Sequence, residues 1–160
     1  MEKYIGVKIV QAKPMNLFEA EEKLQRKISQ SAQNQEGYLV KYEDGYLSWS
    51  PKGIFEEANR KTDGMTFGLA VEALKKGFRV CRKGWNGKGM FLYLTSGSIV
   101  PIVNLKPETS KALFGERLLE CDQTIEIKSH IDMKAADGTI TIGWNATQVD
   151  MLAEDWMIVE

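Results

Sequence analysis

The alternation of hydrophobic and polar residues is most regular between residues 65 and 94. Apolar residues first recur at helical spacing, behind Thr66 as a favourable N-cap and ahead of Gly77, which closes the helix. Two short apolar runs then have the composition of strands. The pattern therefore predicts one helix followed by two strands, at residues 78–81 and 91–94.

The segment between these strands, RKGWNGKG at residues 82–89, is rich in glycine and in basic residues. Its glycines allow a tight turn and close approach to a ligand, and the cations of Arg82, Lys83 and Lys88 suit a phosphate. A tryptophan in such a turn is difficult to bury on all sides, so we expect the ring of Trp85 to be available for stacking on a base. Because the segment does not open a helix, it matches neither the dinucleotide-binding fingerprint nor the P-loop.

The first sixty residues have a different pattern and are predicted to form a separate module, residues 1–61, followed by a polar linker at residues 60–64. The predicted elements are a strand at 4–10 ended by Pro14, a helix capped by Asn16 that runs through Ile28, a hairpin that turns at Asp44-Gly45, and a helix with Pro51 as its first residue. The hairpin carries four aromatic residues, for which we favour cross-strand packing over a binding face: Tyr38, Tyr42, Tyr46 and Trp49.

Beyond residue 94 the apolar runs are short and separated by turn residues. They predict an irregular strand at 99–105 interrupted by Pro101, a short helix within 108–119, strands at 124–127 and 130–133, a hairpin that turns at Asp137-Gly138, a short helix capped by Asn145 or Thr147, and a final strand at 156–159. Strands joined by hairpins with a few short helices indicate an α+β fold with a mainly antiparallel sheet, in two small modules.

Composition limits the possible chemistry. The chain of 160 residues has a net charge of −1, no apolar run of membrane-spanning length and no signal-peptide pattern, so we expect it to stay in the compartment where it is made. His130 is the only histidine, and Cys81 and Cys121 lack the spacing of a metal-binding pair. We therefore expect neither a metal nor a cofactor, and Cys81 is interpreted as a small buried hydrophobic residue.

The distribution of charge is more informative than its sum. No acidic residue occurs between Glu72 and Glu108, whereas acids dominate from Glu108 onward. A basic middle and an acidic end fit a local site for an anionic ligand or electrostatic docking between subunits. The near-zero net charge argues against general binding of long nucleic acids. The basic residues of the middle are Lys75, Lys76, Arg79, Arg82, Lys83, Lys88 and Lys106.

Three acids near the end of the chain raise the possibility of catalysis. On a helix, Asp150 and Glu154 would share a face, and one of them would be placed to act as a general base. An exposed helix end explains them and Asp155 more simply. Asp150 is alternatively an acceptor for ribose hydroxyls or an adenine amino group.

Three motifs together resemble the Thoeris anti-defence 2 family of small phage proteins. They are the helix start Met65-Thr66-Phe67-Gly68, the run Gly84-Trp85-Asn86-Gly87-Lys88-Gly89-Met90-Phe91, and the ending Asp150-Met151-Leu152-Ala153-Glu154-Asp155-Trp156. The resemblance covers about half of the chain at its C-terminal end, within the module at residues 65–160.

This resemblance implies a phage sponge that acts in the cytoplasm of the bacterial host and is not an enzyme. It would sequester cyclic nucleotide immune signals, chiefly glycocyclic ADP-ribose and in some members cyclic oligonucleotides, without cleaving them. The family also implies a homo-oligomer, with a tetramer ahead of a dimer. A nucleotide-cleaving enzyme and a single-stranded nucleic-acid or protein-interaction module are the alternatives.

Residue type and resemblance together give eight expected ligand contacts. Trp85 would stack on the base and Asn86 would hydrogen-bond to it. The remaining roles are assigned as follows: Arg82 and Lys83 would neutralise the pyrophosphate, Phe67 and Met90 would form apolar walls, and Thr147 and Asp150 would complete the pocket, with a neighbouring subunit as one source of these last two side chains.

Overall fold

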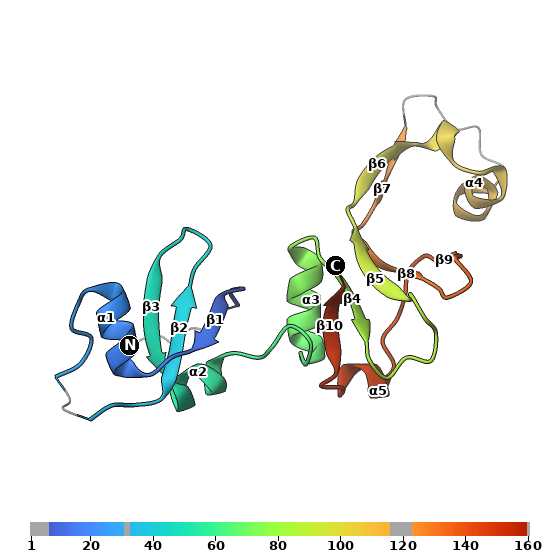
Figure 1. Cartoon of the computed structure of the whole chain (residues 1–160). Coiled ribbons are helices and arrows are strands. Elements are labelled where there is room, and N and C mark those ends of the chain that lie inside the picture. Colours follow the sequence, from blue (N-terminus) through green and yellow to red (C-terminus); the bar gives the residue numbers. More distant parts are fainter. Residues whose placement is uncertain (1–6, 31–32, 116–122, 160) are drawn as a thin grey trace. The chain divides into compact units, whose positions relative to one another are not determined.

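The computed structural model describes residues 7–30, 33–115 and 123–159. The chain divides into two compact units, Met1–Thr62 and Asp63–Glu160. Figure 1 shows that each unit has its own sheet with short helices beside it, and the paired strands are antiparallel. The predicted α+β class with mainly antiparallel sheets is confirmed.

The N-terminal unit has a three-stranded sheet in the order β1-β2-β3. Its elements are β1 (Gln11–Pro14), α1 (Leu17–Leu24), β2 (Gly37–Lys41), β3 (Leu47–Pro51) and α2 (Lys52–Ala58). The predicted cap of α1 is confirmed, because the Asn16 side chain accepts from the Glu19 N–H at 3.0 Å and the Glu19 carboxylate accepts from the Asn16 N–H at 3.4 Å. The predicted hairpin turn is confirmed as well, with Gly45 at φ +85°.

Three predicted boundaries in this unit are wrong. The first strand begins at Gln11 and includes Pro14. Proline is tolerated there because β1 is an edge strand, in which an N–H can be missing. Residues 4–6 of the predicted strand lie outside the described residues. Helix α1 ends at Leu24, because the carboxylate of Glu21 instead accepts the N–H groups of Ile28 and Ser29. Pro51 is extended, at φ −56° and ψ 145°, so α2 begins one residue later.

The aromatic residues of the hairpin make internal contacts, but the expected cross-strand packing is wrong for Tyr38, whose partners lie in α2. Tyr38 stacks on Phe55 with ring centroids 4.4 Å apart, and its hydroxyl donates to Glu56. The indole N–H of Trp49 donates to the Met15 carbonyl at 2.7 Å. Tyr42 and Tyr46 lie 5.9 Å apart across the turn.

The C-terminal unit has a five-stranded sheet in the order β10-β4-β5-β8-β9, and α3 packs on one of its faces. Its elements are α3 (Phe67–Lys75), β4 (Arg79–Arg82), β5 (Phe91–Thr95), β8 (His130–Lys134), β9 (Ile140–Thr141), α5 (Gln148–Met151) and β10 (Trp156–Val159). Thr66 caps α3 and Gly77 follows it with φ +87°, as predicted. The core between α3 and the sheet consists of Met65, Ala70, Ala73, Leu74, Val80, Leu92 and Trp156. Cys81 is half-buried in β4, and burial raises the pKa of its thiol.

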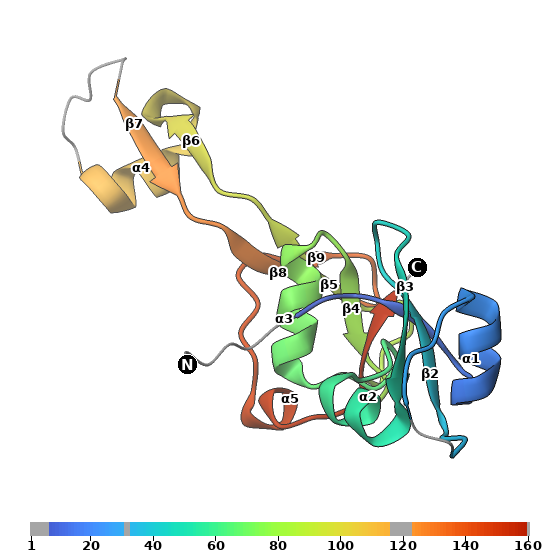
Figure 2. The ribbon, with the colours of Figure 1, turned by 90° about the vertical axis from the view of Figure 1, so that its left-hand side faces the viewer.

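An arm joins β5 to β8 and extends away from the five-stranded sheet (Figure 2). It contains β6 (Ser98–Pro101), the 3₁₀ turn η1 (Ile102–Asn104), α4 (Pro107–Phe114) and β7 (Thr124–Ile127). The predicted interruption at Pro101 is confirmed, since β6 ends there. The predicted helix is confirmed over 108–114, and its remainder from residue 116 lies outside the described residues. No helix within the described ranges is long and apolar enough to cross a membrane.

Two glycines of the N-terminal unit offer a matched test of its packing. A Cβ at Gly37 would lie 2.4 Å from the Ser50 carbonyl oxygen and from the Trp49 ring, whereas a Cβ at Gly53 would meet no atom within 4 Å. We expect Gly37→Ala to lower the free energy of unfolding of this unit by roughly 1–3 kcal/mol through overpacking. Gly53→Ala, inside α2, should instead raise it by about 0.5–1 kcal/mol. Urea unfolding of both variants checks this, and equal effects would contradict the packing of Trp49 over Gly37.

Candidate functional site

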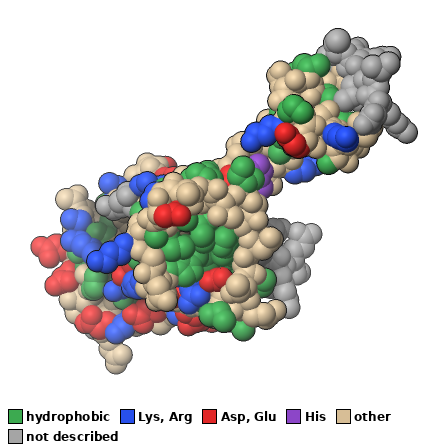
Figure 3. Space-filling model, turned by 90° about the vertical axis from the view of Figure 1, so that its right-hand side faces the viewer, with side chains coloured by type: hydrophobic (Ala, Val, Ile, Leu, Met, Phe, Trp, Pro, Cys, Tyr) green, Lys and Arg blue, Asp and Glu red, His purple; other side chains and the backbone are tan. Residues whose placement is uncertain are grey.

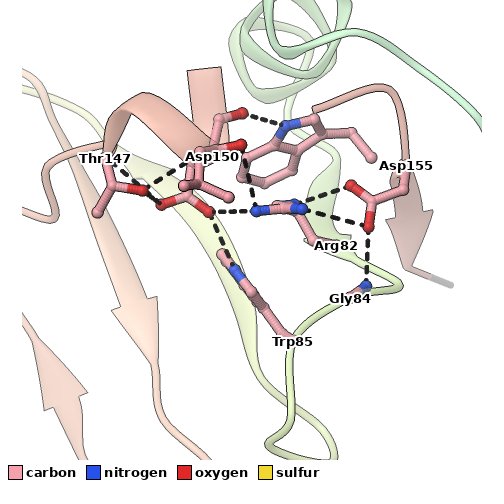
Figure 4. A network of polar contacts seen from close by, with 8 residues as sticks. Arg82, Gly84, Trp85, Thr147, Asp150 and Asp155 are labelled. Atoms are coloured by element: carbon pink, nitrogen blue, oxygen red, sulfur yellow. Dashed lines mark hydrogen bonds and ion pairs between the residues drawn. The ribbon is translucent and has the colours of Figure 1, made fainter. Parts of the chain in front are cut away.

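The glycine-rich segment between β4 and β5 begins at an ionic network (Figure 4). Arg82, the last residue of β4, donates from Nε to Asp155 at 2.8 Å and from Nη1 to Asp150 at 2.8 Å. The side chains of Arg82 and Asp150 are only 14% and 11% exposed. Since charges with so little exposure are costly unless they are paired, these contacts fix the end of β4 against the C-terminal segment.

Asp150 is the centre of this network. Its Oδ1 accepts from Arg82 and from the indole N–H of Trp85, the latter at 3.3 Å, and its Oδ2 accepts from the hydroxyl of Thr147 at 2.7 Å and from the Thr147 N–H at 3.1 Å. The Asp150 N–H donates back to the Thr147 hydroxyl, which closes a capping box at the start of α5. Burial on its own raises the pKa of Asp150, but these hydrogen bonds outweigh it and lower the pKa to about 2.

Asp155 holds the start of the glycine-rich segment. Its Oδ2 accepts the Gly84 N–H at 2.8 Å, and its carbonyl accepts the Lys83 N–H at 3.2 Å. A Cβ at Gly84 would approach that carboxylate oxygen to 2.9 Å, so the close contact favours glycine. Hydrogen bonds with Arg82 and Gly84 lower the pKa of Asp155, and burial opposes them.

An aromatic cluster lies beside the ionic network. Trp156 is fully buried, and the rings of Phe67, Trp85 and Trp144 lie around it with centroids 5.5, 5.5 and 6.1 Å from its own. The indole N–H of Trp156 donates to the Asp150 carbonyl at 2.9 Å. Trp156 is therefore a core residue, as expected. The expectation that Trp85 lies apart from the core is wrong, because its half-buried ring packs edge-on against two tryptophans.

The remainder of the glycine-rich segment is more open. Lys83, Asn86 and Lys88 are exposed, and the Lys83 ammonium lies 3.7 Å from the Asp63 carboxylate. Met90 is half-buried, with its side chain against Gly87. The segment thus exposes polar and basic side chains, while its first residues are held in place by Asp155.

The structure brings most of the predicted residues together but distributes their roles differently. Thr147 and Asp150 lie beside Arg82 within one chain and do not need a neighbouring subunit to meet it. The donors of Arg82 contact two carboxylates, so its charge is already neutralised within the chain. Glu154 does not share a helix face with Asp150, because α5 ends at Met151.

Trp144 and Asp155 were not among the eight expected ligand contacts. Asp155 lies in the ending motif and was interpreted only as part of an exposed helix end, whereas Trp144 lies six residues before that motif. A separate open hollow of about 570 Å³ lies in the N-terminal unit, along α1. None of the eight predicted residues lines it. We assign the site to the glycine-rich segment, where charge, aromatic rings and a fixed backbone coincide.

The comparisons with known proteins identify the family of the C-terminal unit. The model of the Tad2-like family, described as the Thoeris anti-defense 2-like domain, matches residues 65–159, and the chain belongs to this family. A relative named Thoeris anti-defense 2, from Bacillus phage SP01, is 40% identical over 95 residues, which cover 59% of this chain and 94% of the relative. Family membership supports a phage anti-defence role for this chain.

The Asp150 network yields a prediction about stability. We expect Asp150→Asn to lower the free energy of unfolding at pH 7 by about 1.5–3 kcal/mol, because hydrogen bonds to a charged group are lost while Asp155 still pairs with Arg82. The pKa of Asp150 is lower in the folded chain than in the unfolded one, so this stabilisation is complete above pH ~4 and is lost as the pH falls toward 2. The difference between wild type and variant should therefore shrink across that window.

Denaturant unfolding at a series of pH values measures this difference. Glu154→Gln is the matched control, since Glu154 is exposed and lies outside α5. Its effect should stay within about 0.5 kcal/mol. A difference for Asp150→Asn that is constant from pH 7 to pH 2 would show that its carboxylate is not the source of the stabilisation.

Proposed function

We propose that the C-terminal unit binds a cyclic nucleotide immune signal, with glycocyclic ADP-ribose as the principal ligand, and sequesters it without cleavage. The observation that carries this proposal is that the glycine-rich segment combines a fixed backbone with exposed polar side chains. Its start is fixed by Asp155 and by the contacts of Trp85, whereas Asn86 and Lys88 are exposed on it. A backbone ordered before binding reduces the entropy lost when a ligand docks.

The roles of the predicted residues follow from their contacts. Asn86 forms hydrogen bonds with the nucleobase of the ligand, and Lys83 supplies positive charge for its phosphates. The accessible part of the Trp85 ring packs against the nucleobase. The remaining polar residues act indirectly, because their side chains are engaged within the chain and hold the segment in position: Arg82, Thr147 and Asp150. The ring of Phe67 packs beside Trp156, and Met90 supplies an apolar contact to the ligand.

The electrostatics of the site favour binding over turnover. A general base at neutral pH works best with a pKa near 7. Asp150 has a pKa of about 2, and the pKa of Asp155 is also lowered, so both carboxylates are weak bases. His130 lies at the start of β8 with its Nδ1 2.9 Å from the Lys128 carbonyl and its Nε2 3.5 Å from Asp132.

We expect the protein to bind glycocyclic ADP-ribose and to release it chemically intact. The test is incubation followed by heat denaturation and chromatography of the released nucleotide. Linear ADP-ribose that accumulates with time would contradict sequestration and identify a nucleotide-cleaving enzyme. Binding of single-stranded oligonucleotides without binding of the small ligand would identify a nucleic-acid module.

The same assay with two asparagine variants locates the pocket. Asn86→Ala should weaken binding by roughly tenfold, through the loss of hydrogen bonds to the ligand, with an unchanged melting temperature. Asn104→Ala is the control, because Asn104 is also exposed but lies in the arm. Equal affinities of the two variants would move the pocket away from the glycine-rich segment.

We further propose that copies of the chain associate, as a tetramer ahead of a dimer. Figure 3 shows apolar side chains gathered on a face of the C-terminal unit below the arm. Several apolar residues of this unit are more than two-thirds exposed, and covering such surface favours association: Ile99, Ile142, Val149 and Leu152. Light scattering at micromolar concentration should give a mass that is a multiple of 18.1 kDa. A stable monomer would contradict the proposal.

A further inference from the structure

The ring of Phe91 in β5 has two cations over it. The guanidinium carbon of Arg79 lies 4.9 Å from the ring centroid, and the Lys134 ammonium lies 5.9 Å from it. Each distance is within the range of a cation–π contact. Two like charges drawn to one ring repel each other, and an anion that contacts both cations would relieve that repulsion.

Strand pairing explains how these residues meet. Val80 of β4 pairs with Leu92 of β5, and Phe91 pairs with Lys134 of β8. Val80 and Leu92 are fully buried on the α3 side. Because side chains alternate along a strand, Arg79, Phe91 and Lys134 lie on the other face of the sheet.

Neither cation is neutralised by a neighbouring acid within the described ranges. No carboxylate there lies within 4.0 Å of Arg79 or Lys134, whereas the surface lysines Lys75 and Lys128 each contact a glutamate at 2.6 Å. The Lys134 charge contributes to a lowered pKa of Asp137, behind the hydrogen bonds from Thr139, so Asp137 in the β8–β9 turn is an acid close to Lys134. Asp132 is two residues before Lys134 on the same face of β8, and its carboxylate accepts from Thr95 and Gly143.

The pair of cations borders the glycine-rich segment. The Lys134 ammonium donates to the Gly89 carbonyl at 3.2 Å, and Gly89 follows the exposed Lys88. A ligand on the glycine-rich segment would therefore lie near Arg79, Lys88 and Lys134, none of which forms an ion pair with another described residue. Arg82, by contrast, is held by Asp150 and Asp155.

We propose that Arg79 and Lys134 form an anion subsite that holds phosphate groups of the nucleotide bound at the glycine-rich segment. This inference rests on the proposed function for the identity of the whole ligand. The subsite itself recognises a phosphate or pyrophosphate group, by charge-assisted hydrogen bonds from both cations. Phe91 positions the two cations and does not itself recognise the anion.

Two titrations of the full chain test the subsite. In the first, inorganic pyrophosphate is added to ¹⁵N-labelled protein, and we expect the amide signals of Arg79, Phe91 and Lys134 to shift with saturation. In the second, calorimetry with glycocyclic ADP-ribose compares wild type with the double variant Arg79→Gln/Lys134→Gln. We expect the double variant to bind roughly ten- to hundredfold more weakly.

The control is Lys75→Gln/Lys128→Gln, which removes the same charge at two lysines that are paired with glutamates. Its affinity should remain within about twofold of wild type. If Arg79→Gln/Lys134→Gln binds like this control, or if pyrophosphate shifts no signal at the subsite, the inference is overturned while sequestration stands. If pyrophosphate shifts these signals but no nucleotide binds, the subsite stands and the proposed function fails.

Discussion

The ion pair between Arg82 and Asp150 is the interaction on which the functional region depends. The two residues are separated by 68 positions and join the end of β4 to the start of α5. Little solvent reaches either side chain, so each charge needs the other, and the remaining capacity of Asp150 is filled by Thr147 and Trp85. Because these hydrogen bonds hold Arg82, the position at which the glycine-rich segment follows β4 is fixed.

This arrangement separates the supporting side chains from those to which we assign ligand recognition. The buried side supplies aromatic packing around Trp156 and the paired charges, and the exposed side carries Asn86 and Lys88. A binding site is more selective when its contact groups stand on a supporting layer that does not rearrange. The low pKa of Asp150 comes from its hydrogen bonds with Arg82, Thr147 and Trp85, which keep the carboxylate ionised within this supporting layer.

The family domain and the C-terminal unit have nearly the same limits, 65–159 and Asp63–Glu160. The N-terminal unit has its own sheet, and the rings of its hairpin are engaged in internal contacts. An anti-defence role therefore attaches to the C-terminal unit. There the paired strands also place Arg79 and Lys134 over Phe91, beside the glycine-rich segment.

The amino-acid sequence determined the features that depend on a few neighbouring residues. The Thr66 cap, the stop at Gly77 and the Asp44-Gly45 turn were predictable because local dihedral preferences and short-range hydrogen bonds set them. Only the tertiary structure decided that Arg82 is neutralised within the chain and that Trp85 packs against the core. Those outcomes depend on contacts with residues 59 to 73 positions away. Burial of the whole sheet sets which distant segments meet, and no local pattern specifies it.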